Sequence, residues 1–200
     1  MLPPAFENTS THIPKMSVRW YFIPMAITSS VLPAIIDAKK KDEALYYDRL
    51  KKLFLAMFWL SLAVPILITL FSREIVQLVF GTPYTGAASA LSIQCWAGLF
   101  VFSGLVSNQW YLVENLNRYT LYRHVTGAVV NILGNLVLIP MYGIDGAAFA
   151  TLLTQFFASY LFDFFVAPAR VLFRIKTQTY FLFLPITYKY IRAMMARGTA

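Results

Sequence analysis

Long apolar segments alternate with short polar connectors along this chain. Five of these segments approach the length needed to cross a bilayer, near residues 20–36, 53–71, 87–112, 125–140 and 146–167. The hydrocarbon core of a membrane requires about 20 helical residues, and only helices or closed barrels satisfy their backbone hydrogen bonds there. The pattern therefore predicts an all-α fold, an integral membrane helical bundle of about five transmembrane helices.

Small and turn-forming residues mark the boundaries between these segments. Ser72 and Gly81 are suited to begin and end a short helix over residues 73–80, which we expect to lie flat at the membrane interface. The connector over residues 141–145 joins two segments that carry small or polar stripes, an arrangement that favours close packing of membrane helices. We assign structural roles to five residues: Gly81, Tyr84, Pro140, Gly143 and Gly146.

The charges follow the connectors. The chain has 17 Lys and Arg against 9 Asp and Glu, and only 13% of its residues are charged. Nearly all bases lie in residues 37–52, in residues 113–124 and beyond residue 170, so alternate connectors are basic. By the positive-inside rule these connectors and the carboxyl terminus are cytoplasmic. Membrane topology explains the basic residues better than nucleic-acid binding does. We expect residues 169–200 to form a basic cytoplasmic tail at the interface, with a sixth span over 177–188 as the alternative.

The sequence offers no catalytic or cofactor motif. Gly81 and Gly86 have the spacing of two phosphate-loop glycines, but alanines stand at the Lys and Ser/Thr positions that follow. His12 and His124 lie far apart in polar sequence, without a nearby cluster of metal ligands. No grouping of serine, histidine and carboxylate indicates a nucleophile. We expect a protein that is not an enzyme and that needs neither metal nor cofactor.

Polar residues inside the apolar segments are the candidates for a substrate cavity, because such residues are costly in lipid. They are Asn108, Gln109, Asn131, Asn135, Gln155 and Asp163. The alternative for each amide is a hydrogen bond that only joins two helices. For Asp163 the alternative is an ion pair with Arg170 or another cytoplasmic base.

Several motifs together resemble one family of transporters. They are WYFIPMAITSSVLPAIIDAKKK, YYDRLKKLF, VFGTPYTGAASAL followed by Trp96, WYLVENLNRY and NILGNLVLIPMYGIDGAAFAT. In this order and spacing they resemble the carboxyl-terminal half of O-antigen and exopolysaccharide flippases. These flippases are the polysaccharide-transporter branch of the multidrug, oligosaccharidyl-lipid and polysaccharide exporter superfamily. The resemblance covers residues 16–176.

The resemblance implies a two-lobed helical transporter of a bacterial inner membrane, which alternates between inward-open and outward-open states. Its cargo would be an oligosaccharide on a polyprenyl diphosphate. Residues 18–168 would form part of the carboxyl-terminal lobe, after an amino-terminal extension over residues 1–17. We therefore expect a fragment, whose partners are membrane lipids, a missing amino-terminal lobe and polysaccharide assembly proteins. The alternatives are a drug antiporter of the same superfamily, driven by sodium or protons, and a non-transporting remnant or assembly subunit.

Overall fold

A computed structural model describes residues 22–198 of the chain, so the predicted extension over residues 1–17 and His12 lie outside the described part. The described residues form helices joined by short turns and contain no strand. Four helical stretches are long and apolar enough to cross a membrane: Phe22–Lys41, Glu43–Val79, Thr82–Val113 and Asn117–Phe165. The protein is thus an all-α membrane helical bundle, as predicted.

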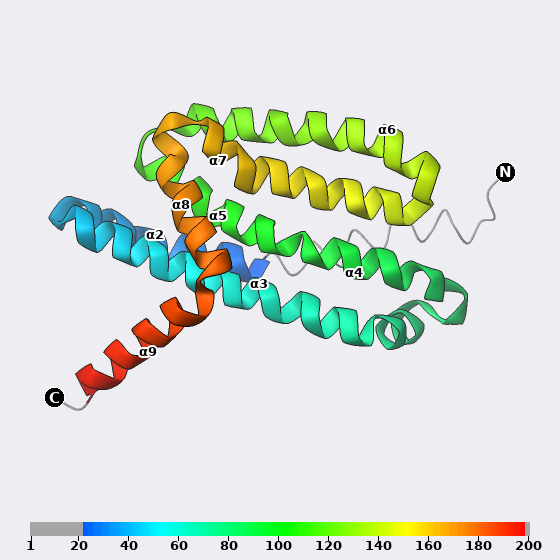
Figure 1. Cartoon of the computed structure of the whole chain (residues 1–200), viewed down its shortest axis with the longest axis horizontal. Helices are drawn as coiled ribbons and strands as arrows, with labels where there is room; N and C mark the ends of the chain where they lie inside the picture. The colour runs from blue at the N-terminus through cyan, green and yellow to red at the C-terminus, as the bar shows by residue number, and fades with distance from the viewer. Residues whose placement is uncertain (1–21, 199–200) are drawn as a thin grey trace.

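The longest helices run side by side along the long axis of the molecule (Figure 1). In chain order, the elements are α2 (Phe22–Lys41), α3 (Glu43–Phe80), η1 (Thr82–Ala87), α4 (Ala88–Trp96), α5 (Gly98–Val113), α6 (Asn117–Phe156), η2 (Phe157–Leu161), α7 (Phe162–Phe165), η3 (Ala167–Ala169), α8 (Arg170–Phe181) and α9 (Phe183–Gly198).

The fourth stretch folds back on itself and accounts for two predicted spans. Gly143 has a positive φ (φ 58°, ψ −129°) and reverses the chain inside α6. This divides the stretch into an outgoing arm, residues 117–142, and a return arm, residues 144–165 (Figure 1). The arms pack closely, because a Cβ placed on Gly134 would lie 3.2 Å from the Cβ of Ala150. With this hairpin, the four stretches supply five long apolar helical segments, which is the number predicted.

Polar contacts join neighbouring connectors at each end of the bundle. Lys39 pairs with Glu114 at 2.8 Å and so links the α2–α3 junction to the α5–α6 junction. At the opposite end, the Ser89 hydroxyl donates to Asp145 at 2.8 Å, which links α4 to the hairpin turn. Figure 1 shows both basic junctions at one end of the molecule. Connectors that alternate in charge therefore lie at opposite ends, as the charge pattern predicts.

The predicted short helix over residues 73–80 is the last part of α3, and a kink at Phe71, next to the predicted start at Ser72, separates it from the rest of that helix. α3 continues to Phe80 and has non-helical torsions only at Phe71 (φ −116°, ψ 20°). Val76 is buried with Leu91 of α4, and this packing holds the last turns of α3 against the bundle. The predicted end is correct, because Gly81 has φ +90° and its N–H donates to the Gln77 carbonyl.

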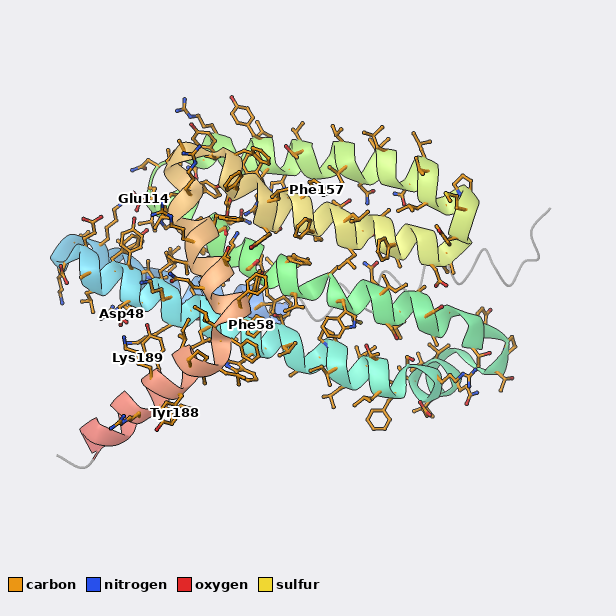
Figure 2. The ribbon with its side chains drawn as sticks, in the orientation of Figure 1. Asp48, Phe58, Glu114, Phe157, Tyr188 and Lys189 are labelled. Atoms are coloured by element: carbon orange, nitrogen blue, oxygen red, sulfur yellow. The ribbon has the colours of Figure 1, made fainter. Side chains whose placement is uncertain are left out.

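The carboxyl-terminal segment forms two helices that pack on the bundle. α8 crosses the long helices at a steep angle (Figure 1), with Leu172 and Ile175 buried in the main core cluster. The helix breaks at Leu182, so no single helix covers residues 177–188, and neither α8 nor α9 is among the candidate spans of the described chain. Phe183 of α9 contacts the rings of Phe58 and Trp59 on α3. In Figure 2, Asp48 of α3 and Lys189 of α9 lie at the same end of the molecule.

Candidate functional site: a polar pocket between α5 and the α6 hairpin

A pocket of about 430 Å³ lies between α5 and the two arms of the α6 hairpin. Glycines shape its walls, because a Cβ on Gly104 would lie 2.6 Å from the Ser159 hydroxyl and a Cβ on Gly127 would lie 3.1 Å from Ala158. Its polar lining combines amides, hydroxyls, one imidazole and one guanidinium, and contains no carboxylate: Asn108, Arg123, His124, Asn131, Thr151, Thr154, Gln155 and Ser159. The pocket therefore offers both hydrogen-bond donors and acceptors within membrane-spanning helices.

Three predicted cavity residues line this pocket together. Asn108 comes from α5, Asn131 from the outgoing arm and Gln155 from the return arm. Asn135 lies one turn further and donates its amide to the Asn131 Oδ1 at 3.0 Å. Gln109 is half-buried and is not among the residues that line the pocket.

Arg123 is a pocket residue that the sequence did not single out. We counted it among the bases of a polar connector, but the folded chain leaves it only 3% exposed. Its Nη2 donates to the Asn108 Oδ1 at 2.6 Å and to the Gly104 carbonyl at 3.2 Å. Arg123 stands just before an apolar segment, and this position does not indicate burial. The groups that bind its guanidinium, Gly104 and Asn108, belong to α5 and not to its own helix.

Asp163 lies outside the pocket, in a buried ion pair. Its carboxylate binds the Lys176 ammonium at 2.6 Å, and both side chains are 0% exposed. The Tyr111 hydroxyl donates to the other carboxylate oxygen at 2.7 Å. Arg170 is not the partner, since its guanidinium donates to the Phe164 carbonyl at the surface. Asp163 thus pairs with a base of the predicted tail, which was the alternative to a cavity role, but that base is Lys176 and the pair is buried and not at the interface.

The ion pair is connected to the pocket through Ser159. The Lys176 ammonium donates to the Ser159 backbone carbonyl as well as to Asp163. The Ser159 hydroxyl donates to the Gln155 Oε1 at 3.3 Å, and both of these residues line the pocket. Ser159 belongs to η2, a π-helical turn, and turns of this kind often occur at functional sites.

The five residues with predicted structural roles occupy turns and close contacts. Gly81 ends α3, and Tyr84 of η1 packs against the cluster around Val76. Gly143 forms the hairpin turn, while Pro140 lies just before it in a shallow apolar depression. A Cβ on Gly146 would overlap the Leu138 carbonyl, so this glycine permits the closest approach of the two arms.

The part of the chain described by the structure contains no group of three or more histidine, cysteine or carboxylate side chains that could hold a metal ion. His124 is at the pocket but exposed, and Cys95 is partly buried beside the α3–α4 contact. The polar lining of the pocket consists of hydrogen-bonding side chains, the His124 imidazole and one buried cation, Arg123.

Comparisons with known proteins support the membrane class. The chain is 27% identical over 147 residues to an uncharacterized membrane protein of Methanocaldococcus jannaschii, a match that covers 72% of this chain. The chain spans only 28% of that relative's length. No family model and no solved structure matches the chain. Together with its apolar helices, the match identifies the chain as a membrane protein.

Proposed function

We propose that this bundle is part of a flippase that moves a polyprenyl-diphosphate-linked oligosaccharide across a membrane by alternating access. The observation that carries the proposal is the pocket between α5 and the α6 hairpin, where Asn108, Asn131 and Gln155 converge from three helical segments. Sugar hydroxyls donate and accept hydrogen bonds, and side-chain amides match both functions.

The cost of polar groups in a membrane supports a functional pocket. Polar residues within spans usually face a bundle interior or a water-filled path and mark the route of a substrate. A volume of about 430 Å³ falls in the range of small-molecule sites, roughly 300–1,000 Å³. It accommodates part of an oligosaccharide, so the remaining path would be formed by further helices. The resemblance over residues 16–176 supplies the class of cargo.

We also propose that the end of the bundle bearing the α2–α3 and α5–α6 junctions faces the cytoplasm of a bacterial inner membrane. Its basic residues favour this orientation by the positive-inside rule. Topology reporters placed after Leu112 and at the carboxyl terminus should report from the cytoplasm, and one placed at Gly143 should report from the opposite side. A reporter on the wrong side at any of these positions would refute the orientation.

The proposed cargo is tested by complementation. The chain is expressed alone, and joined to the amino-terminal half of an O-antigen flippase, in a cell that lacks its own flippase, and surface O-antigen is measured. The joined chain should restore surface O-antigen, and Asn108→Leu or Gln155→Leu should reduce it. Gln109→Leu is the matched control, because Gln109 neighbours Asn108 but does not line the pocket.

Two outcomes would contradict the proposal. One is equal O-antigen display by all three variants, which would leave the pocket amides with a packing role only. The other is restored drug efflux without O-antigen display, which would assign the chain to a drug antiporter.

A further inference from the structure

One face of α9 packs on α3 and fixes the orientation of the helix. Phe183, Thr187 and Tyr190 follow one another at spacings of four and three residues, so they share a face. Phe183 contacts the Trp59 ring at 5.4 Å between centroids, and the Trp59 indole N–H donates to the Thr187 hydroxyl at 2.9 Å. The Tyr190 hydroxyl donates to Asp48 at 2.9 Å. The opposite face of α9 therefore turns away from α3.

That opposite face combines an apolar stripe with a basic border. Leu184, Tyr188 and Ile191 are 63%, 66% and 50% exposed and also follow one another at spacings of four and three residues. Lys189 and Arg192 each come directly after a residue of the stripe and lie along its border. Both bases are exposed, and no carboxylate of the described residues lies within 4.0 Å of either one. We call these five residues the outer face of α9.

The charge of the carboxyl-terminal segment is of one sign. Residues 164–200 contain six Lys and Arg and no Asp or Glu. Lys176 is held by Asp163 inside the bundle, and Asp48 already accepts from Lys52 and Tyr190. An anionic surface outside the chain is thus the complement of the outer face. A second copy of α9 would instead bring like charges together, which disfavours association.

The position of α9 places its outer face at the border between the apolar and polar parts of the bundle. The helix runs from Phe58, in the apolar part of α3, towards Asp48 near the start of α3. Figure 1 shows α9 leaving the bundle at an angle, and in Figure 2 Asp48 and Lys189 lie at the same end of the molecule. Trp and Tyr side chains such as Trp59 and Tyr188 are enriched at the membrane–water interface.

We propose that the outer face of α9 binds the surface of a membrane leaflet that contains anionic phospholipid. Leu184, Tyr188 and Ile191 enter the boundary between head groups and acyl chains, and the two bases contact the negatively charged head groups. This assigns a face and a lipid charge to what the sequence predicts only as a basic interfacial tail. The surface is independent of the proposed cargo, because lipid binding is measured without transport.

The test measures hydrogen–deuterium exchange of the full chain in nanodiscs that hold one copy each. The discs contain phosphatidylcholine alone or phosphatidylcholine with phosphatidylglycerol. Each base near an anionic surface contributes about fivefold, so the α9 amides should exchange about 25-fold more slowly in the phosphatidylglycerol discs. Sodium chloride at about 1 M should remove most of this difference, because salt screens exposed charges. The α5 amides should exchange equally in both discs and so report an intact bundle.

Two double variants separate the basic border from the apolar stripe. Lys189→Gln with Arg192→Gln should abolish the difference between the two kinds of disc. Leu184→Gln with Ile191→Gln should speed exchange of the α9 amides in both discs, because the stripe no longer enters the membrane. Lys40→Gln with Lys41→Gln is the matched control for charge. These two bases are exposed at the end of α2, so the variant loses the same charge and should keep the wild-type difference.

Four outcomes would overturn the proposal. The first is equal exchange of the wild-type α9 amides in both discs. The second is a variant without Lys189 and Arg192 that keeps the full difference. The third is loss of the difference in the Lys40 and Lys41 control, which would assign the effect to overall charge. The fourth is protection of α9 only in larger discs that hold two copies, which would assign the outer face to a second copy of the chain.

Discussion

The buried pair of Asp163 and Lys176 allows a quantitative prediction about stability. It joins α7 to α8, and both side chains are 0% exposed. Replacing Lys176 by Met would leave the Asp163 carboxylate with Tyr111 as its hydrogen-bond donor. Replacing Asp163 by Asn would leave the ammonium with the Ser159 carbonyl. Each single change removes one half of a buried pair, and such changes cost about 3–5 kcal/mol of unfolding free energy.

The double variant should be far less damaging than the sum of the single ones. Lys176→Met combined with Asp163→Asn removes both charges and retains an oxygen that can accept the Tyr111 hydroxyl. Because replacing an entire buried pair is often neutral or stabilising, we expect a coupling energy of about 3 kcal/mol or more in the double-mutant cycle. The measurement is equilibrium unfolding of the purified variants in detergent, followed by circular dichroism.

The chain contains a matched control for this cycle. Lys52 and Asp48 form an ion pair at 2.5 Å one helical turn apart, with side chains 50% and 39% exposed. Lys52→Met should change the unfolding free energy by no more than about 1 kcal/mol, because solvent screens exposed pairs. The reasoning would be refuted if Lys176→Met were as mild as Lys52→Met, or if the two buried changes were simply additive.

Two further predictions concern the hairpin and α9. Gly146→Ala should destabilise the bundle by about 1–3 kcal/mol, because the new methyl group would overlap the Leu138 carbonyl. Gly86→Ala is the control and should have little effect, because nothing lies within 4 Å of its Cβ position. Thermal unfolding measures both variants, and equal unfolding midpoints would contradict the close packing at Gly146. Burial and the hydrogen bond to Asp48 raise the pKa of Tyr190 from 10.0 to about 12. The folded chain therefore holds this proton longer than the unfolded chain, and the contribution of Tyr190 to the docking of α9 should fall as the pH rises from 10 to 12. Absorbance titration should show one late-ionising tyrosine fewer in Tyr190→Phe, and an unchanged titration would contradict this assignment.

The two arms of the α6 hairpin and the turn between them were predictable from the sequence. The length and apolarity of residues 125–140 and 146–167 predicted two spans, and Gly143 was expected at the turn between them. The structure agrees, because a single residue of positive φ suffices to reverse the chain there. The end of α3 was predicted from Gly81 for the same reason. The start of a short helix was predicted at Ser72, and α3 has its kink at the neighbouring Phe71, after which Val76 packs on Leu91 of α4.

The sequence did not predict that the side chains of Arg123 and Lys176 are buried. Lys176 meets Asp163 thirteen residues away, after the turn between α7 and α8 brings them together. Arg123 meets the Gly104 carbonyl nineteen residues away, across two helices that approach through small residues. Arg123 was predicted to be a connector base and Lys176 a base of the tail, because the charge pattern reports topology and not burial.

The amino-acid sequence by itself determined that this protein is an all-α membrane bundle, which segments form its long apolar helices and where most of its turns lie. These properties depend on local apolarity and on single turn residues, which act over one or two helical turns. Only the tertiary structure decided which polar side chains share a pocket, and that Asp163 pairs with Lys176 while Arg123 has no counter-ion. The physical reason is that burial and charge compensation depend on the partners that other helices bring into contact.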